Sequence, residues 1–272
     1  MSKGKILYIS QEITPYLPAN VISSLGQKLP QSLQERGYEV RTFMPKYGCI
    51  NERRNQLHEV IRLSGMNLII DDTDHPLIIK VATLQPSRMQ VYFIDSDDYF
   101  VHHGTPELEI NISPEDNDER IMFFARGVIE TVKKLRWEPA LIHCTGWVTA
   151  LAPLYLKSKY SDDPSFRNSK IVLSLIDDDF DGTLDPRMLE KLKMDGLSDS
   201  QLSAIADNPV NAIALKKLAV DHSDAIVISS KDIPLELAEY VHASGKPVLE
   251  APTDNEDFIE LHAKFYESLF ND

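Results

Sequence analysis

Three things are scarce in this 272-residue sequence: cysteine, positive charge and long apolar runs. Its two cysteines, Cys49 and Cys144, lie far apart without C-x-x-C spacing, so no disulfide framework is predicted and a reducing cytoplasm is expected. No apolar run approaches the roughly 20 residues that span a bilayer, so no membrane segment is predicted. The net charge of −14 argues against nucleic acid or an anionic membrane as a partner, because both demand basic patches.

Short apolar, β-branched runs alternate with helical patterns along the chain. The strand-like runs cover residues 5–10, 39–43, 77–84, 90–95, 140–144, 170–176, 224–229 and 247–251. The helical patterns cover residues 21–35, 118–135, 148–159, 210–220, 233–242 and 256–270. This alternation predicts an α/β fold, a Rossmann-like, doubly wound and mostly parallel sheet with helices on both faces.

The segment from His58 to Asp95 departs from the alternation, because strand-like runs follow one another there with only short turns between them. It predicts a β-hairpin or meander inserted at the edge of the sheet. No Gly/Ser-rich or Pro-rich linker divides the chain, so a single domain over residues 1–250 is expected. Residues 251–272 are expected to form a helix that packs back on it.

Glycine is missing from the first ten residues of the stretch YLPANVISSLGQKLP, where the first predicted strand leads into the first helix. Nucleotide-binding α/β folds carry glycines at this junction, because backbone without Cβ lets a phosphate approach the helix N-terminus. Here no glycine lies in the stretch before Gly26. The junction is therefore not built like a phosphate loop.

Three consecutive acids, Asp177, Asp178 and Asp179, follow the predicted strand at 170–176. They are candidates for hydrogen-bond acceptors toward sugar hydroxyls or for a divalent-cation site. A solvated acidic loop is the favoured interpretation, because a D-D-D run lacks the alternate-residue spacing of loop chelators.

Other polar and aromatic residues stand near predicted strand ends and helix starts. Trp147 follows the strand at 140–144, where open α/β sheets bind ligands, and it could stack on a sugar or cap the next helix. His143 lies inside that apolar strand and is interpreted as a packed core residue. Asn117 opens a predicted helix, where capping is the first interpretation and sugar contact the second.

Five segments, in chain order, resemble the N-terminal half of the ADP-glucose-type glycogen and starch synthases, glycosyltransferase family 5. KILYISQEITPY is similar to that family's first strand and Glu-x-x-Pro turn, with Glu12 and Pro15 in place. The other four are LPQSLQERGYEVRTFMPKYG, VYFIDSDDYF, DNDERIMFFARGVIE and LIHCTGWVTALAPLYLK. The resemblance implies one half of a GT-B glycosyltransferase, in which a second Rossmann-like domain grips most of the donor nucleotide.

The sequence departs from the family pattern where the family contacts its sugar nucleotide. Pro18–Val21 stand in place of the Lys-x-Gly-Gly loop, and Thr145 and Gly146 stand in place of a His-Asp pair. The three consecutive aspartates stand where the family has neutral polar groups. No catalytic residue, metal ligand or cofactor is predicted, and the predicted substrate-binding residues are Glu12, Asn20, Asn117, Thr145, Trp147, Asp177 and Asp178.

These departures lead to three hypotheses about function. The first is a domain without autonomous catalytic activity that binds an α-glucan or a protein partner. The alternative is an ADP-glucose-dependent glucosyltransferase, active with a separate donor-binding partner. The second alternative is cation or other ligand binding at the acidic loop 177–181. The sequence makes no prediction of the oligomeric state.

Overall fold

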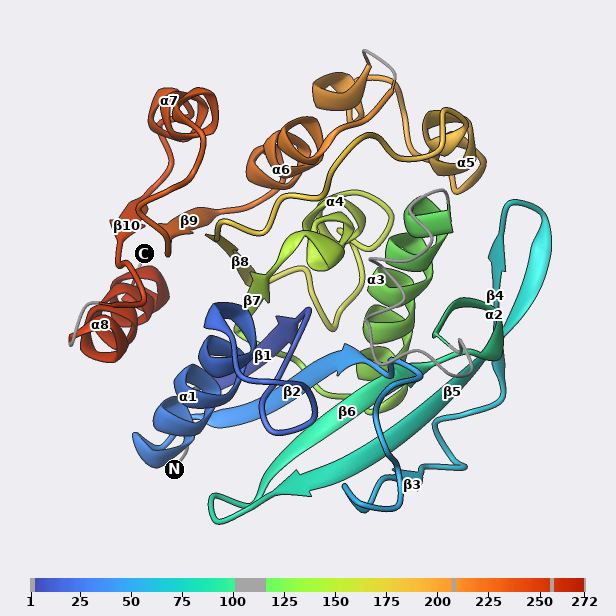
Figure 1. Cartoon of the computed structure of the whole chain (residues 1–272). Helices are drawn as coiled ribbons and strands as arrows, with labels where there is room; N and C mark the ends of the chain where they lie inside the picture. Colours follow the sequence, from blue (N-terminus) through green and yellow to red (C-terminus); the bar gives the residue numbers. More distant parts are fainter. Residues whose placement is uncertain (1–2, 101–115, 207–208, 255–256, 272) are drawn as a thin grey trace.

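The computed structural model of the chain describes residues 3–100, 116–206, 209–254 and 257–271. Within these residues ten strands join in one mixed sheet in the order β10-β9-β8-β7-β1-β2-β6-β5-β3, with β4 paired to β5 (Figure 1). The strands are β1 (Lys5–Ser10), β2 (Glu39–Pro45), β3 (His58–Glu59), β4 (Met66–Ile70), β5 (Thr73–Leu84), β6 (Met89–Asp95), β7 (Leu141–Thr145), β8 (Lys170–Leu175), β9 (Ala225–Ile228) and β10 (Val248–Glu250).

The strands from β10 to β6 run parallel, and β3, β4 and β5 add antiparallel pairs at one edge. The central strands β1, β7, β8 and β9 are buried along almost their whole length. Apolar runs such as IVLSL and AIVI match this position, because strands of a parallel sheet are covered on both faces.

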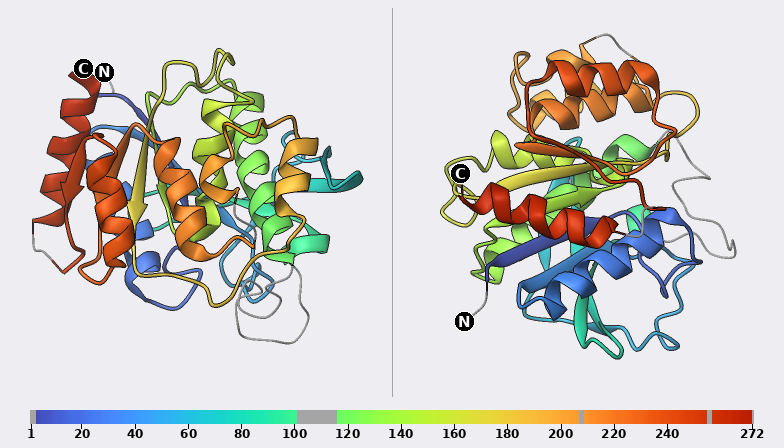
Figure 2. Two further views of the ribbon diagram at one scale, coloured as in Figure 1. Left: turned by 90° about the horizontal axis from the view of Figure 1, so that it is seen from above. Right: turned by 90° about the vertical axis from the view of Figure 1, so that its left-hand side faces the viewer.

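Helices cover both faces of the sheet. They are α1 (Val21–Glu35), α2 (Asp97–Phe100), α3 (Asn117–Lys134), α4 (Leu151–Lys157), α5 (Met188–Met194), α6 (Ala212–Asp221), α7 (Leu235–Ala243) and α8 (Phe258–Asn271), with short 3-10 turns η3 (Trp147–Thr149) and η4 (Ser203–Ile205). Helices α1 and α8 run side by side on one face, whereas α3, α4 and α6 cover the other (Figure 2). The predicted fold class is confirmed.

The side chains of β1 show how the two faces are filled. Ile6 and Tyr8 pack in the core under α1 and α8, whereas Leu7 and Ile9 point into the larger core under α3 and α4. This alternation is the two-residue period of a strand.

The final helix α8 packs against the domain through apolar and polar contacts. Tyr266 is fully buried, and its hydroxyl is hydrogen-bonded to Nδ1 of His143 on β7. At the surface, Arg36 at the end of α1 donates to Glu260 at 2.7 Å. None of the described helices combines the length and the apolar character required to cross a bilayer.

Two elements begin more than two residues away from their expected bounds. Strand β5 begins at Thr73 rather than near residue 77, because its first residues pair with β4 in a hairpin that belongs to the predicted meander. The helix expected over 148–159 is a 3-10 turn followed by the shorter α4. Thr149 Oγ1 donates to the Gly146 carbonyl at 2.8 Å, and the Ala150 N–H donates to Trp147 O at 3.0 Å, which tightens this first turn.

Candidate functional site

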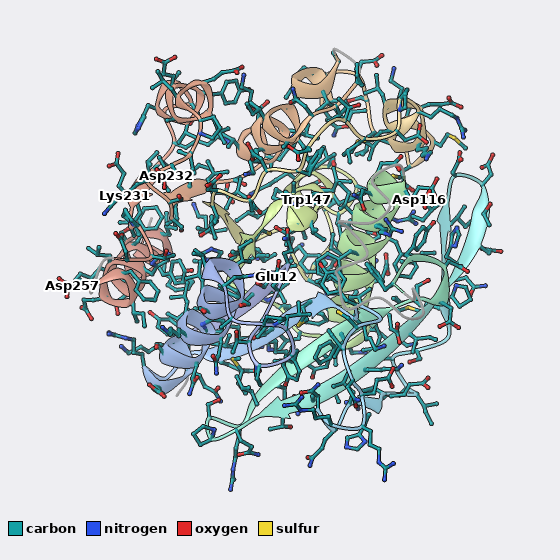
Figure 3. All side chains as sticks on the ribbon, viewed as in Figure 1. Glu12, Asp116, Trp147, Lys231, Asp232 and Asp257 are labelled. Atoms are coloured by element: carbon teal, nitrogen blue, oxygen red, sulfur yellow. The ribbon has the colours of Figure 1, made fainter. Side chains whose placement is uncertain are left out.

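The carboxyl ends of β1 and β7 meet where the strand order of the sheet reverses. From β1 the chain builds outward to β6, and α3 then returns it to β7 on the other side of β1. Ligands of open α/β sheets bind in the crevice outside such a point. Figure 3 shows Glu12 and Trp147 in this region, between α1 and α3.

The two strand ends are held in close contact. The N–H of Gln11 donates to Thr145 O at 3.0 Å. Gly146 follows with a φ of +90°, and a Cβ on it would lie 2.6 Å from Cβ of Gln11. Both the backbone conformation and the close approach therefore require glycine at this position.

The loop between β1 and α1 brings together two of the predicted residues, Glu12 and Asn20. The buried Glu12 carboxylate accepts hydrogen bonds from Gln11 Nε2 at 3.2 Å and Asn20 Nδ2 at 2.5 Å. Asn20 is also the N-cap of α1: its Oδ1 accepts from the Ser23 N–H at 2.8 Å, while its own N–H donates to Ser23 Oγ at 2.9 Å. This capping box uses side chains of the loop to satisfy the helix terminus.

Thr145 and Trp147 lie beneath the surface of the crevice. Thr145 is fully buried, and its Oγ1 is hydrogen-bonded to the Tyr8 hydroxyl at 3.0 Å. Trp147 is 4% exposed and its ring packs against Phe180 with centroids 4.7 Å apart. Contact between either side chain and a ligand would require these groups to rearrange, so their substrate-binding role stays a prediction.

The three aspartates of the acidic run differ in exposure and in their contacts with Lys216. Asp177 is exposed, whereas the side chain of Asp178 is 4% exposed and pairs with Nζ of Lys216 at 2.6 Å. Asp179 also pairs with Lys216, at 2.5 Å. The expectation of a solvated loop is therefore wrong for Asp178. Among the described residues, no group of three or more His, Cys, Asp or Glu is arranged to hold a metal ion.

Burial and charge act against each other in this Lys–Asp cluster. Burial raises the pKa of the Asp178 carboxyl, and the nearby Lys216 ammonium only partly opposes the rise. Burial also lowers the pKa of Lys216, but the Asp178 and Asp179 carboxylates outweigh it and the net pKa is raised. The ammonium form is thus the one that the surroundings favour.

A pocket of about 240 Å³ opens at the carboxyl ends of β8, β9 and β10. Among the predicted residues, Asp177 lines it. Lys231 and Asp232 lie on the side of β10 in Figure 3, and Lys231 pairs with Asp254 at 2.7 Å. The lining residues are Val21, Ile176, Asp177, Ser229, Ser230, Lys231, Asp232, Pro252, Thr253 and Asp254.

Asn117 takes part in the packing at the start of α3. It is fully buried, and its Oδ1 accepts a hydrogen bond from Arg120 Nη1 at 2.9 Å. Arg120 also donates from Nε to Tyr99 O on α2 at 2.9 Å. The next residue, Asp118, is fully buried beside Lys191 at 2.9 Å, and burial raises the pKa of Asp118 to about 6 although Lys191 opposes the shift.

Residues 5–247 match the family model of the starch synthase catalytic domain. The chain belongs to this family. It is 34% identical over 228 residues to the glycogen synthase of Chlorobium luteolum, a match covering 84% of this chain and 46% of that protein. It is 39% identical over 173 residues to the glycogen synthase of Chlorobium chlorochromatii, covering 63% of this chain and 35% of that protein. The chain thus spans about half the length of the curated relatives it matches.

The fold of a solved family member is similar over almost the whole chain. The catalytic domain of starch synthase IV from Arabidopsis thaliana, bound to ADP and acarbose, superposes with a TM-score of 0.71 at 19% identity. The match covers 93% of this chain and 52% of that one. At this identity the likeness concerns the fold, which is one domain of a GT-B glycosyltransferase.

Sequence reasoning missed Lys216, the partner of Asp178 and Asp179 in this starch synthase domain. The sequence does indicate that Lys216 is buried, because the helical spacing of Ala212, Leu215 and Ala219 places it on the apolar face of its helix. A lysine on such a face requires a buried counter-charge. His143 was correctly interpreted as a core residue: it is fully buried, and burial holds its pKa well below the usual value.

Proposed function

We propose that this chain is the acceptor-side half of a glucosyltransferase of the glycogen-synthase type. In this proposal it binds an α-glucan at the carboxyl edge of the sheet. A second Rossmann-like domain, outside these 272 residues, supplies the groups that hold the donor's diphosphate. The observation that carries the proposal is the match of 84% of this chain to one half of a glycogen synthase at 34% identity.

The need for a second domain follows from the chemistry of the leaving group. Transfer from a nucleotide sugar requires cations or free N–H groups that stabilise charge on the departing diphosphate. Here the Glu12 carboxylate lies beside the start of α1, and Asn20 and Ser23 close that helix terminus with their own side chains. A donor phosphate at this place would meet a carboxylate and an occupied helix N-terminus.

The glucan side of the proposal rests on the pocket beside Asp177. The hydroxyl groups and carboxylates that line this pocket are suited to bind sugar hydroxyls, and Val21 and Pro252 add apolar surface. Starch synthase IV, whose fold is similar, was solved with acarbose and ADP. The two free cysteines agree with a reducing compartment, and we keep the cytoplasm as the place of action within the proposal.

A reconstitution assay tests the proposal. The chain alone, with ADP-glucose and glycogen, is expected to transfer no glucose. Addition of the separately produced C-terminal half of the Chlorobium luteolum glycogen synthase is expected to give transfer, whereas neither half alone is active. Transfer by this chain alone would overturn the need for a second domain. No transfer by the mixture, with both halves folded, would overturn the catalytic role.

The second candidate is a binding domain without any catalytic role. It is favoured by the loss of the Lys-x-Gly-Gly and His-Asp elements, whose positions hold Pro18–Val21 and the Thr145–Gly146 pair. The reconstitution assay separates the candidates, and thermal-shift measurements with maltooligosaccharides test the glucan binding that both share, because a ligand that binds the native state raises its apparent stability. Stabilisation by the sugar together with an inactive reconstituted mixture would establish this second candidate.

A further inference from the structure

A single buried ammonium group ties together the loops at the β7–β8 end of the crevice. Lys216 comes from the middle of α6, and its side chain is 4% exposed. Its Nζ donates to the carbonyl of Ile176 at 2.9 Å and lies 2.6 Å from Asp178 and 2.5 Å from Asp179. Its N–H groups are hydrogen-bonded to Ile176 O and to Asp179, and its positive charge pairs with the carboxylate of Asp178.

The cluster extends from Lys216 to the tip of the neighbouring strand. The second carboxylate oxygen of Asp178 accepts the N–H of Trp147 at 2.7 Å. Trp147 opens the 3-10 turn that follows β7, and its ring packs on Phe180 of the acidic loop. Lys216 thus fixes the loop after β8 directly and the turn after β7 through Asp178.

These contacts decide which acid of the D-D-D run faces the pocket. Asp178 and Asp179 turn toward Lys216, and Asp177, which is exposed, lines the pocket. Without the ammonium, Asp178 would be a buried carboxylate lacking its counter-charge, which is a strongly unfavourable arrangement. The loop would then reorganise to bring that carboxylate to water.

We propose that Lys216 is the positioning residue of the glucan-binding pocket: it holds the acidic loop so that Asp177 meets the sugar and Trp147 stays packed against Phe180. The ligand class is a neutral oligosaccharide, because carboxylates accept hydrogen bonds from hydroxyl groups and repel phosphates. The proposal rests on the proposed glucan binding for its ligand. The positioning itself can be measured without any ligand.

The test compares Lys216→Met with a matched control at the next position. Lys217→Met removes a lysine that pairs with Glu236 of α7 at 2.5 Å and that, among the described residues, makes no ion pair or hydrogen bond with the acidic loop. Lys216→Arg retains the cation. All variants are made with Trp137→Phe, so that Trp147 is the single tryptophan that fluoresces. The two readouts are the emission spectrum of Trp147 and the Kd for maltohexaose from calorimetry on folded protein.

The expected result has two parts. Lys216→Met shifts the Trp147 emission to the red, because the ring loses its fixed place against Phe180, and raises the Kd for maltohexaose at least tenfold. Lys217→Met leaves both readouts unchanged, and Lys216→Arg recovers a large part of both. If Lys216→Met fails to fold, the double variant Asp178→Asn with Lys216→Met replaces it, because it leaves no unpaired charge at this pair and keeps an amide oxygen for the Trp147 N–H.

Two outcomes separate this proposal from the proposed function. If the unsubstituted protein does not bind maltohexaose, glucan binding fails, and the emission of Trp147 alone decides the positioning role. If Lys216→Met, or the double variant in its place, is folded with unchanged emission and unchanged affinity, Lys216 does not position the loop and the proposal is overturned.

Discussion

The N-cap of α1 offers the most direct test of how the β1–α1 loop is built. Asn20 makes two separate contributions: its Oδ1 accepts the Ser23 N–H, and its Nδ2 donates to the buried Glu12 carboxylate. Replacing an asparagine N-cap by alanine costs about 1 kcal/mol. The hydrogen bond to Glu12 adds about 1 kcal/mol, a low value for a charged acceptor because Asn20 itself is exposed. We therefore expect Asn20→Ala to lower the free energy of unfolding by about 2 kcal/mol.

Asn20→Ser is the matched control for this substitution. Serine caps a helix N-terminus about as well as asparagine, but it has no amide to donate to Glu12. We expect it to cost about 1 kcal/mol, half of the alanine effect. Urea unfolding followed by circular dichroism measures both, and a change of 1 kcal/mol corresponds to about 2–4 °C in Tm for a domain of this size. Equal stabilities of the two variants would refute the separate contribution of the cap, and a serine variant as stable as the original chain would refute that of the Glu12 bond.

Three further substitutions are expected to change stability through single physical causes. Gly146→Ala is expected to cost at least about 2 kcal/mol in urea unfolding, because φ is +90° and the new Cβ meets Gln11; an unchanged midpoint would contradict this. Asp118→Asn removes a carboxyl whose pKa burial raises from 3.8 to about 6, so it is expected to stabilise at pH 7.5 by up to about 3 kcal/mol, less the attraction that Lys191 loses, and by under about 1 kcal/mol at pH 4; a pH-independent effect would speak against buried charge as the cause. Burial lowers the pKa of His262, so the native state stays neutral while the unfolded chain takes up a proton below about pH 6.5. The free energy of unfolding therefore falls as the pH falls below about 6.5. His262→Leu is expected to reduce the slope of this fall by up to about 1.4 kcal/mol per pH unit. Equal slopes of unfolding free energy against pH for the two proteins would exclude the role of His262.

The fold could be predicted from the sequence because its strongest signals are local. The apolar runs of β1, β7, β8 and β9 occupy a parallel sheet, where both faces are buried and no alternation is needed. The bounds of α4 were harder to predict, because its first turn is set by bonds from Thr149 and Ala150 to Gly146 and Trp147 rather than by apolar spacing. Such bonds depend on how the strand end is held.

The site was less predictable, because its arrangement depends on partners distant in sequence. Thr145 was predicted to bind substrate because it stands at a strand end, but its hydroxyl is hydrogen-bonded to the hydroxyl of Tyr8, 137 residues away in sequence. Asp178 stood in an acidic run typical of a solvated loop, and Lys216, which pairs with it, follows 38 positions later on helix α6. A run of like charges indicates solvent exposure only when no buried counter-charge lies nearby.

The hydrogen bonds and ion pairs at the carboxyl ends of the strands limit which ligands can bind there. Polar groups that already bond to one another bind a ligand weakly, because those bonds must be exchanged for new ones. Near the start of α1, Glu12 and Asn20 are bonded to each other, and the carboxylate adds repulsion against any phosphate. Beside β8 the situation differs, because Lys216 pairs with Asp178 and Asp179 whereas Asp177 faces a pocket with serine and threonine hydroxyls. These contacts agree with the proposed function, in which a neutral sugar binds beside Asp177 and another domain supplies the positive charge for a donor phosphate.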